Sequence, residues 1–210
     1  MNTIITIGRE YGSGGREIGR LVAAKLDVPF YDKEILTRAA QESGLCKEIF
    51  ERHDEKASMS GMLTGSTSPV MHMGTATVGL QMPLNQRVFL AQFDAINRIA
   101  SEGPCVIVGR CADYILETAG KEDLVKIFVY ADIPTCVRRT QETDGITDTK
   151  EALNKLNKIT KQRKSYHKYF TGKEWEDVTN YDLPINASKL ELDQVVELIK
   201  DYIRMIGYDI

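Results

Sequence analysis

A glycine-rich stretch near the start of the chain has the residues that a phosphate-binding loop needs. Residues 8–19 read GREYGSGGREIG, with five glycines in twelve positions. The stretch follows the apolar residues 4–7 and precedes the apolar residues 21–23. At a junction between a strand and a helix, backbone amides and the helix N-terminus offer positive potential, and glycines let an anion approach closely. We therefore expect a phosphate group to bind here.

The loop lacks the lysine of the usual P-loop pattern, which is glycine, four residues, glycine, lysine and a hydroxyl residue. With the second glycine placed on Gly14, the first falls on Arg9, the lysine on Gly15 and the hydroxyl on Arg16. A cation in the first turn of a helix is unfavourable unless an anion neutralises it. We therefore predict that Arg16 grips a phosphate. The alternative is a glycine-rich turn that only lets the helix pack against the strand.

Other arginines are predicted at strand ends and on a basic helix. Arg110 follows the apolar residues 105–108, and Asp113 comes shortly after it. Ligands of open α/β sheets bind at the carboxyl ends of strands, so Arg110 is expected to face a substrate. Arg139 lies in the helix expected after the next strand, and Arg163 lies in the basic segment ITKQRKSYHKYF. That segment suits a lid that closes on phosphates, or else an ordinary solvated face.

The elements expected to position these residues alternate between strands and helices. Apolar runs predict strands at 4–7, 28–31, 105–108, 125–130 and 182–186, and helical spacing predicts helices at 16–26, 32–40, 46–56, 85–101 and 192–205. The runs 105–108 and 125–130 lack polar alternation, which indicates strands covered by helices on both faces. Asp32 is expected to cap the helix that begins beside it. The predicted fold class is α/β with a parallel sheet.

Composition and charge exclude several classes of function. The 210 residues suit a single domain, and no run of about 18 apolar residues is present to span a membrane. The first residues lack the features of a secretory signal peptide. A net charge of −3 argues against non-specific nucleic-acid binding. The four cysteines and three histidines lack zinc-site spacing, and Cys105 in its apolar run suggests packing in a reducing cytoplasm.

Residues 57–83 form a segment without charged side chains that is rich in Gly, Ser, Thr and Met. This composition favours a flexible flap or linker. The alternative is that the methionines form a soft apolar surface for a substrate or a partner. The sequence leaves open whether the chain forms a homodimer.

These segments together resemble the cytidylate kinase-like family of P-loop nucleoside monophosphate kinases along nearly the whole chain. The likeness rests on GREYGSGGREIG, VPFYDKEIL, PCVIVGRCADYIL, VKIFVYADIPTCVRR and QRKSYHKYFTGKEWEDVTNYDLPINAS. It implies a three-layer α/β/α fold in one domain, residues 1–210, with an acceptor-binding insert over about 32–103 and a helical lid over about 145–175. It also implies transfer of the γ-phosphoryl group of ATP, with Mg²⁺ between the phosphates, to a small nucleotide such as CMP or dCMP.

The resemblance implies roles for individual residues. The loop that holds ATP corresponds to Gly12, Ser13, Gly14, Gly15, Arg16 and Glu17. The acceptor nucleotide is expected to contact Asp32, Arg38, Arg110, Asp113 and Tyr166. Arg139 and Arg163 are expected to bridge donor and acceptor, and with Arg16 they form the predicted catalytic set. No side-chain metal site is expected, so Mg²⁺ would be held by the phosphates or through water by Glu17.

The chain departs from the family pattern at three positions. Gly15 stands in place of the loop lysine, Cys111 in place of an aspartate after the strand-end arginine, and Thr160 in place of an aspartate upstream of Arg163. These departures define the alternative function, a non-catalytic nucleotide-binding regulatory protein that has lost the P-loop lysine. A third interpretation is an oligomeric scaffold, or a kinase of an unrelated acceptor. The recognised base depends on a few hydrogen bonds that the pattern leaves open.

Overall fold

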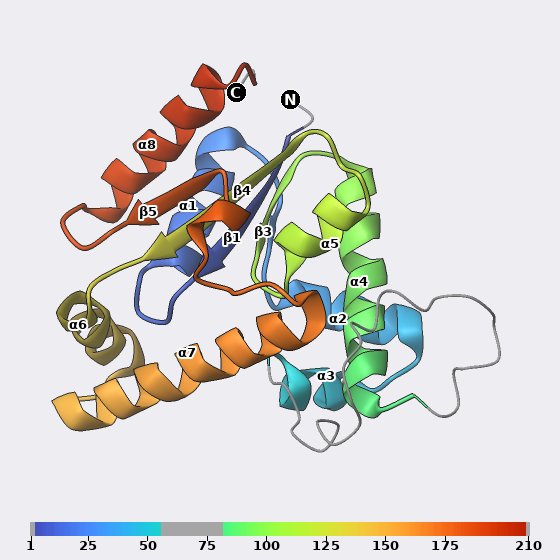
Figure 1. Ribbon diagram of the computed structural model, residues 1–210, viewed down its shortest axis with the longest axis horizontal. Coiled ribbons are helices and arrows are strands. Elements are labelled where there is room, and N and C mark those ends of the chain that lie inside the picture. Colours follow the sequence, from blue (N-terminus) through green and yellow to red (C-terminus); the bar gives the residue numbers. More distant parts are fainter. Residues whose placement is uncertain (1–2, 56–81, 209–210) are drawn as a thin grey trace.

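A computed structural model describes residues 3–55 and 82–208 and contains a parallel sheet with helices on both faces (Figure 1). The strands are β1 (Ile4–Arg9), β2 (Phe30–Tyr31), β3 (Cys105–Val108), β4 (Leu124–Tyr130) and β5 (Leu183–Asn186). They lie in the order β2-β3-β1-β4-β5, and all pairings are parallel. Because β1 is central, the glycine loop that follows it leaves the sheet in the middle of its carboxyl edge.

The helices of the described residues form three groups (Figure 1). One face of the sheet is covered by α1 (Gly15–Leu26) and α8 (Leu192–Met205), and the other side carries α2 (Glu34–Ser43), α3 (Lys47–His53), α4 (Leu84–Glu102) and α5 (Ala112–Thr118). Beyond the carboxyl ends of the strands lie α6 (Ile133–Asp144) and the long α7 (Thr149–Thr171), and a short 3₁₀ helix spans Val178–Asn180. The sheet is therefore the middle of three layers, as the resemblance predicted.

Both faces of the sheet are buried, which explains why its strands are apolar without alternation. Successive side chains of a strand point to opposite faces. Ile5 and Val106 accordingly pack in the core with α1 and α8, whereas Ile4 and Ile107 pack in the core with α2, α4 and α5. The prediction of a parallel sheet covered on both sides is confirmed.

Side-chain caps begin two of the helices near the cleft, α6 and α7, but the cap predicted for α2 does not form. The Asp132 carboxylate accepts a hydrogen bond from the Thr135 N–H at 2.9 Å, and Asp148 caps α7 in the same way. Asp32 was predicted to cap α2, and that prediction is wrong. The helix begins at Glu34, and the residue at its N-cap position is Lys33, which makes no side-chain cap bond. The Asp32 side chain instead pairs with arginines, as described below.

Three further expectations concern Cys105, the segment 57–83 and membrane-spanning helices. Cys105 is buried, and burial raises the pKa of its thiol to about 12, in keeping with a packing role. The predicted flexible segment 57–83 lies almost entirely outside the described residues. Within the described part of the chain, no helix is long and apolar enough to cross a membrane.

Candidate active site

The glycine loop between β1 and α1 opens onto a large cleft. Gly12 and Gly14 have φ angles of 74° and 87°, in the left-handed region that glycine adopts without strain. A Cβ atom on Gly12 would overlap the backbone of Cys136, so the loop packs closely on α6. Gly14 is the N-cap residue of α1 and has no side chain with which to cap the helix. A bound anion can take that role.

The cleft has a volume of about 920 Å³, within the range of small-molecule sites. Arginines from several separate segments line it. They are Arg9 and Arg16 from the first strand and loop, Arg110 from the turn after β3, Arg138 and Arg139 from α6, and Arg163 from α7. The structure thus brings Arg16, Arg110, Arg139 and Arg163 to one cleft, and their predicted roles stay predictions. This concentration of guanidinium groups suits a polyanionic ligand.

Arg110 is the most deeply buried cation of the cleft, with a side chain 1% exposed. It donates to Asp32 Oδ1 at 2.9 Å and to Asp54 Oδ2 at 2.8 Å, so the guanidinium bridges two carboxylates. Gly109, Arg110 and Cys111 all have φ between 55° and 80°. Left-handed backbone at non-glycine residues is costly and often marks functional sites. The strained turn keeps Arg110 aimed into the protein at the end of β3.

The two carboxylates that hold Arg110 differ in their electrostatics. Burial alone would raise the pKa of Asp32, but the charges of Arg110 and Arg9 outweigh it and lower that pKa. Burial dominates at Asp54 and raises its pKa despite the attraction of Arg110. Asp32 is therefore the firmly ionised partner, and it also accepts a hydrogen bond from Arg16 Nε at 2.6 Å.

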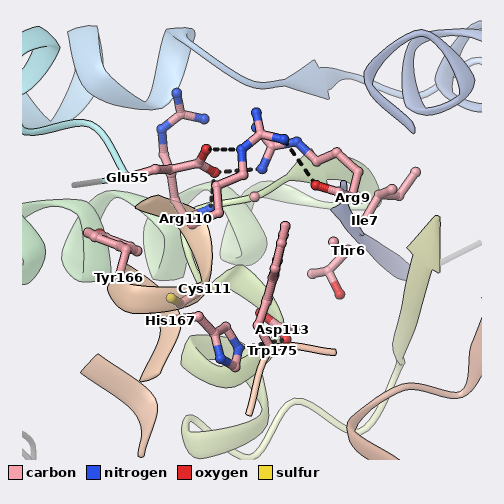
Figure 2. Close-up of a pocket in the computed structure, with 13 residues that line it drawn as sticks. Thr6, Ile7, Arg9, Glu55, Arg110, Cys111, Asp113, Tyr166, His167 and Trp175 are labelled. Carbon is pink, nitrogen blue, oxygen red and sulfur yellow. Dashed lines mark hydrogen bonds and ion pairs between the residues drawn. The ribbon is translucent and has the colours of Figure 1, made fainter. Parts of the chain in front are cut away.

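Glu55 lies at the centre of a second group of cations (Figure 2). Its carboxylate is 2.5 Å from Arg9 and 2.8 Å from Arg163 Nε, and it accepts a hydrogen bond from the Arg110 N–H at 3.3 Å. Burial would raise the pKa of Glu55, but Arg9 and then Arg163 outweigh it and hold the pKa well below its ordinary range. The donors come from β1, α7 and the turn after β3, so this carboxylate ties three segments together.

Arg163 also contacts the strand that precedes the loop. Its NH1 group donates to the backbone oxygen of Arg9 at 3.0 Å, and its guanidinium lies 5.7 Å from the ring centre of Tyr11. Arg163 is largely buried, and burial together with the positive charge of Arg9 lowers its pKa. The basic helix α7 is thus anchored at the cleft by this residue, while Lys155, Lys164 and Lys168 of the same helix form ion pairs at the surface.

Arg139 holds the glycine loop in place. Its guanidinium donates to the backbone oxygen of Ser13 at 2.7 Å and to that of Ala187 at 3.1 Å. The Ser13 hydroxyl donates to the oxygen of Glu10 at 2.9 Å, which closes the loop from within. Arg139 therefore links the loop to the segment after β5, and it remains a proposed bridge between donor and acceptor.

Arg16 and Glu17 lie at the solvent side of the cleft. The Arg16 side chain is 59% exposed and pairs with Asp32, whereas Glu17 is paired with Arg20 of the same helix. Both residues line the cleft together with Gly12, Gly14 and Gly15. Their predicted contacts with a phosphate remain a proposal.

Three predicted acceptor residues lie away from the large cleft. Arg38 pairs with Glu42 and Glu102 on the α2 and α4 side. Asp113 lies 3.6 Å from His167 and lines a small inner cavity of about 20 Å³ behind Arg110. Tyr166 lines the same cavity, and its hydroxyl donates to Gln92 at 2.8 Å. None of the three lines the large cleft.

Sequence reasoning missed Arg9, Asp54 and Glu55 as site residues. Arg9 stands at a glycine position of the P-loop pattern, which was a signal that its side chain mattered. Asp54 and Glu55 follow α3 and reach the site only because this helix packs beside α2 and α4. No local pattern of the sequence marks them.

The described residues fit a nucleotide phosphate better than a metal held by protein alone. The loop glycines, the uncapped start of α1 and the surrounding arginines are donors that suit phosphate oxygens. Among residues 3–55 and 82–208, no group of three or more His, Cys, Asp or Glu side chains could hold a metal ion. A divalent cation that accompanies the phosphates is compatible with this donor set, because Mg²⁺ commonly keeps water and phosphate ligands.

A glycine loop after the central strand of a parallel sheet, facing an arginine-lined cleft at the carboxyl edge, defines a kinase of the P-loop class. The chain belongs to the Cytidylate kinase-like family, whose profile matches residues 4–189. The resemblance predicted from the sequence motifs is thereby confirmed. The family supports a phosphotransferase that uses ATP and a small substrate.

Individual relatives agree with this assignment. A cytidylate kinase of Pyrococcus horikoshii is 24% identical over 208 residues, which are 97% of this chain and 91% of that protein. An uncharacterized protein from Eubacterium ventriosum has a crystal structure with 28% identity and a TM-score of 0.68, covering 96% of this chain and 98% of that one. A shikimate kinase from Bacteroides thetaiotaomicron shares the fold, with a TM-score of 0.55, 14% identity and coverage of 96% and 98%.

Proposed function

We propose that the protein transfers the γ-phosphoryl group of ATP to a nucleoside monophosphate of the CMP or dCMP type. The observation that carries this proposal is the convergence of arginines from β1, the glycine loop, the turn after β3, α6 and α7 on one cleft. The relative from Pyrococcus horikoshii is named a cytidylate kinase, which supports a cytidine nucleotide as acceptor.

The triphosphate of ATP would bind at the glycine loop. Gly12, Gly14 and Gly15 let the phosphates approach the backbone, and Arg16 would contact them from the solvent side. Ser13 closes the loop through Glu10 and so sets its shape. Mg²⁺ would be held mainly by the phosphates, since the Glu17 carboxylate is engaged by Arg20.

The acceptor phosphate would bind at the end of β3. Arg110 is the cation there, and Asp32 and Asp54 orient its guanidinium. Residues 32–103 would form the acceptor-binding insert around this point. None of Arg38, Asp113 and Tyr166 lines the cleft in the structure. These residues would therefore act from the shell of side chains around it.

Transfer itself requires positioning and positive charge more than a protein nucleophile. An oxygen of the acceptor phosphate attacks the γ-phosphorus, and the bond from that phosphorus to the bridging oxygen breaks. The products are ADP and a nucleoside diphosphate. Arg139 and Arg163 would stabilise the charge that spreads over the transferred group, with α7 as part of a lid formed by residues 145–175.

The experiment measures binding and turnover separately. Thermal unfolding is followed with ATP, CMP, dCMP, UMP and AMP, each with and without Mg²⁺, because ligands that bind the folded state raise its apparent stability. ADP release is then recorded with ATP and each acceptor. We expect CMP or dCMP to give the fastest release, and Arg110→Ala to slow it strongly.

A matched control is Arg204→Met, which removes an exposed arginine paired with Asp201 on α8, far from the loop. Its turnover should equal that of the unchanged protein. Clear ATP binding without ADP release for any acceptor would contradict the kinase proposal. That result would instead favour a nucleotide-binding regulatory protein.

A further inference from the structure

Arg9 begins where the side chain of a P-loop lysine would begin. A Cβ atom added to Gly15 would overlap the Cβ of Arg9, and it would lie 3.2 Å from the Cβ of Val129. A side chain from only one of residues 9 and 15 can therefore fill this space. The usual pattern has glycine at the first position and lysine at the second. This chain has the two transposed, with arginine at 9 and glycine at 15.

A second glycine keeps the far end of the Arg9 side chain free of obstruction. A Cβ atom on Gly109 would overlap both the NH1 group of Arg9 and the Oε1 atom of Glu55. Gly109 has a φ of 80°, which other residues rarely adopt. Gly15 and Gly109 thus leave room at the two ends of one side chain. The position of the Arg9 side chain therefore depends on glycine at both the loop and the turn after β3.

The Arg9 side chain is buried although one of its hydrogen-bond donors has no partner among the described residues. Its side chain is 7% exposed, although arginines are rarely buried unless they are fully paired. Among the described residues its Nε group is buried without a hydrogen-bond partner. Unpaired buried donors are uncommon in native proteins and often mark a ligand position. Arg9 also lines the large cleft next to the glycine loop, where the phosphates would bind.

The group that faces Arg9 in the structure is the Glu55 carboxylate, which also faces Arg163 and the N–H of Arg110 (Figure 2). Two guanidinium groups and a backbone amide from three segments are a donor set that a phosphate can use equally well. Glu55 itself has a φ of 50°, a costly backbone for a glutamate. The donors around the Glu55 carboxylate therefore require a negatively charged group among them. Glu55 supplies that group only with a backbone conformation that is unfavourable for glutamate.

We propose that Arg9 takes the part of the lysine of other P-loops and supplies positive charge to the β- and γ-phosphates of the nucleotide. These phosphates would displace Glu55 as the partner of the Arg9 guanidinium. This inference rests on the proposed function, which identifies the ligand as a nucleoside triphosphate. Arg16 then keeps an outer role, because it is mostly exposed and pairs with Asp32. In this proposal the lysine absent at position 15 is compensated by Arg9, the last residue of the strand before the loop.

The test compares Arg9→Met with the transposed double variant Arg9→Gly/Gly15→Lys. Calorimetry measures binding of Mg·ATP and of inorganic tripolyphosphate, which carries the phosphates without a base. We expect Arg9→Met to weaken both about tenfold or more, in line with the loss of a charge-assisted contact. The transposed variant should recover most of this loss. Gly15→Lys alone should lower the melting temperature, since two side chains then compete for one space.

Folding is controlled in two ways. Arg9→Met/Glu55→Gln removes both partners of the ion pair, so it leaves no buried unpaired carboxylate, and circular dichroism reports whether each variant is folded. Arg204→Met makes the same charge change far from the loop and should bind both ligands normally. The double variant at 9 and 55 should also bind about tenfold or more weakly than Glu55→Gln alone.

Each outcome separates this inference from the kinase proposal. Tripolyphosphate affinity that is equal in folded Arg9→Met and in the unchanged protein overturns the role of Arg9. A folded transposed variant that binds no better than Arg9→Met overturns it as well. Binding that depends on Arg9 without turnover for any acceptor supports Arg9 and contradicts the kinase. An unchanged protein that binds neither ligand overturns both.

Discussion

Glu55→Gln keeps the size of a side chain but removes the negative charge that lies 2.5 Å from Arg9 and 2.8 Å from Arg163. The three side chains are only 7%, 13% and 14% exposed, so solvent screens their interaction weakly. Removing one partner of a buried ion pair costs about 3–5 kcal/mol. Because the amide oxygen still accepts a hydrogen bond, we expect the lower end, about 3 kcal/mol of lost unfolding free energy at pH 7.

The same substitution predicts a pH dependence with a definite sign. Burial opposes ionisation of Glu55, but Arg9 and Arg163 outweigh it and hold the pKa well below its ordinary value of 4.5. A carboxyl group with a depressed folded-state pKa stabilises the fold fully above its ordinary pKa and loses that contribution as pH falls toward the folded-state pKa. The stability difference between the two proteins should therefore shrink below pH 4.5, by about 1.4 kcal/mol per pH unit.

The assay is urea unfolding followed by circular dichroism at several pH values between 7 and the acid limit of the fold. Glu174→Gln is the matched control, because Glu174 is 70% exposed and pairs with Lys168 on the surface. It should change the unfolding free energy by no more than about 0.5 kcal/mol. The reasoning is refuted if Glu55→Gln equals this control at pH 7, or if its deficit grows on acidification.

Three further substitutions separate the roles of the arginines. Arg16→Ala should weaken ATP binding about tenfold or more, since charge-assisted contacts contribute about 1.5–3 kcal/mol each, and unchanged affinity in calorimetry would remove Arg16 from the donor site. Arg110→Lys keeps the charge but loses the fork that bridges two carboxylates, so steady-state kinetics should show a raised KM for the acceptor with little change for ATP. Equal changes in both KM values would contradict an acceptor role. Arg139→Met removes donors to the loop backbone and should lower kcat and speed hydrogen exchange at residues 12–16. Unaltered exchange there would show that Arg139 does not hold the loop.

The sheet and its glycine loop were predictable because their causes are local. Strands buried on both faces need continuous apolar runs, and 105–108 and 125–130 show this directly. The rule that ligands bind at the carboxyl ends of parallel strands then placed Arg110 at the cleft from its position after β3. Helix boundaries also agreed closely where apolar spacing was regular, as in α4 and α8.

Features that depend on distant contacts were not predictable. Asp32 has the residue type of a helix cap, but Arg110, which is 78 positions away, takes one of its oxygens. Glu55 reaches Arg163 across 108 positions, and no pattern in the sequence links them. The P-loop spacing marked positions 9 and 15 as unusual. It could not show that their side chains would start from the same space, because that depends on how the loop folds back.

A crystal structure with an ATP analogue, Mg²⁺ and CMP tests the central claim most directly. The account predicts the β- and γ-phosphates against the backbone of residues 12–16, with Arg9 within hydrogen-bonding distance and Glu55 turned away from it. The CMP phosphate should lie beside Arg110. A nucleotide bound elsewhere, or phosphates in the cleft while Arg9 stays paired with Glu55 alone, would contradict it.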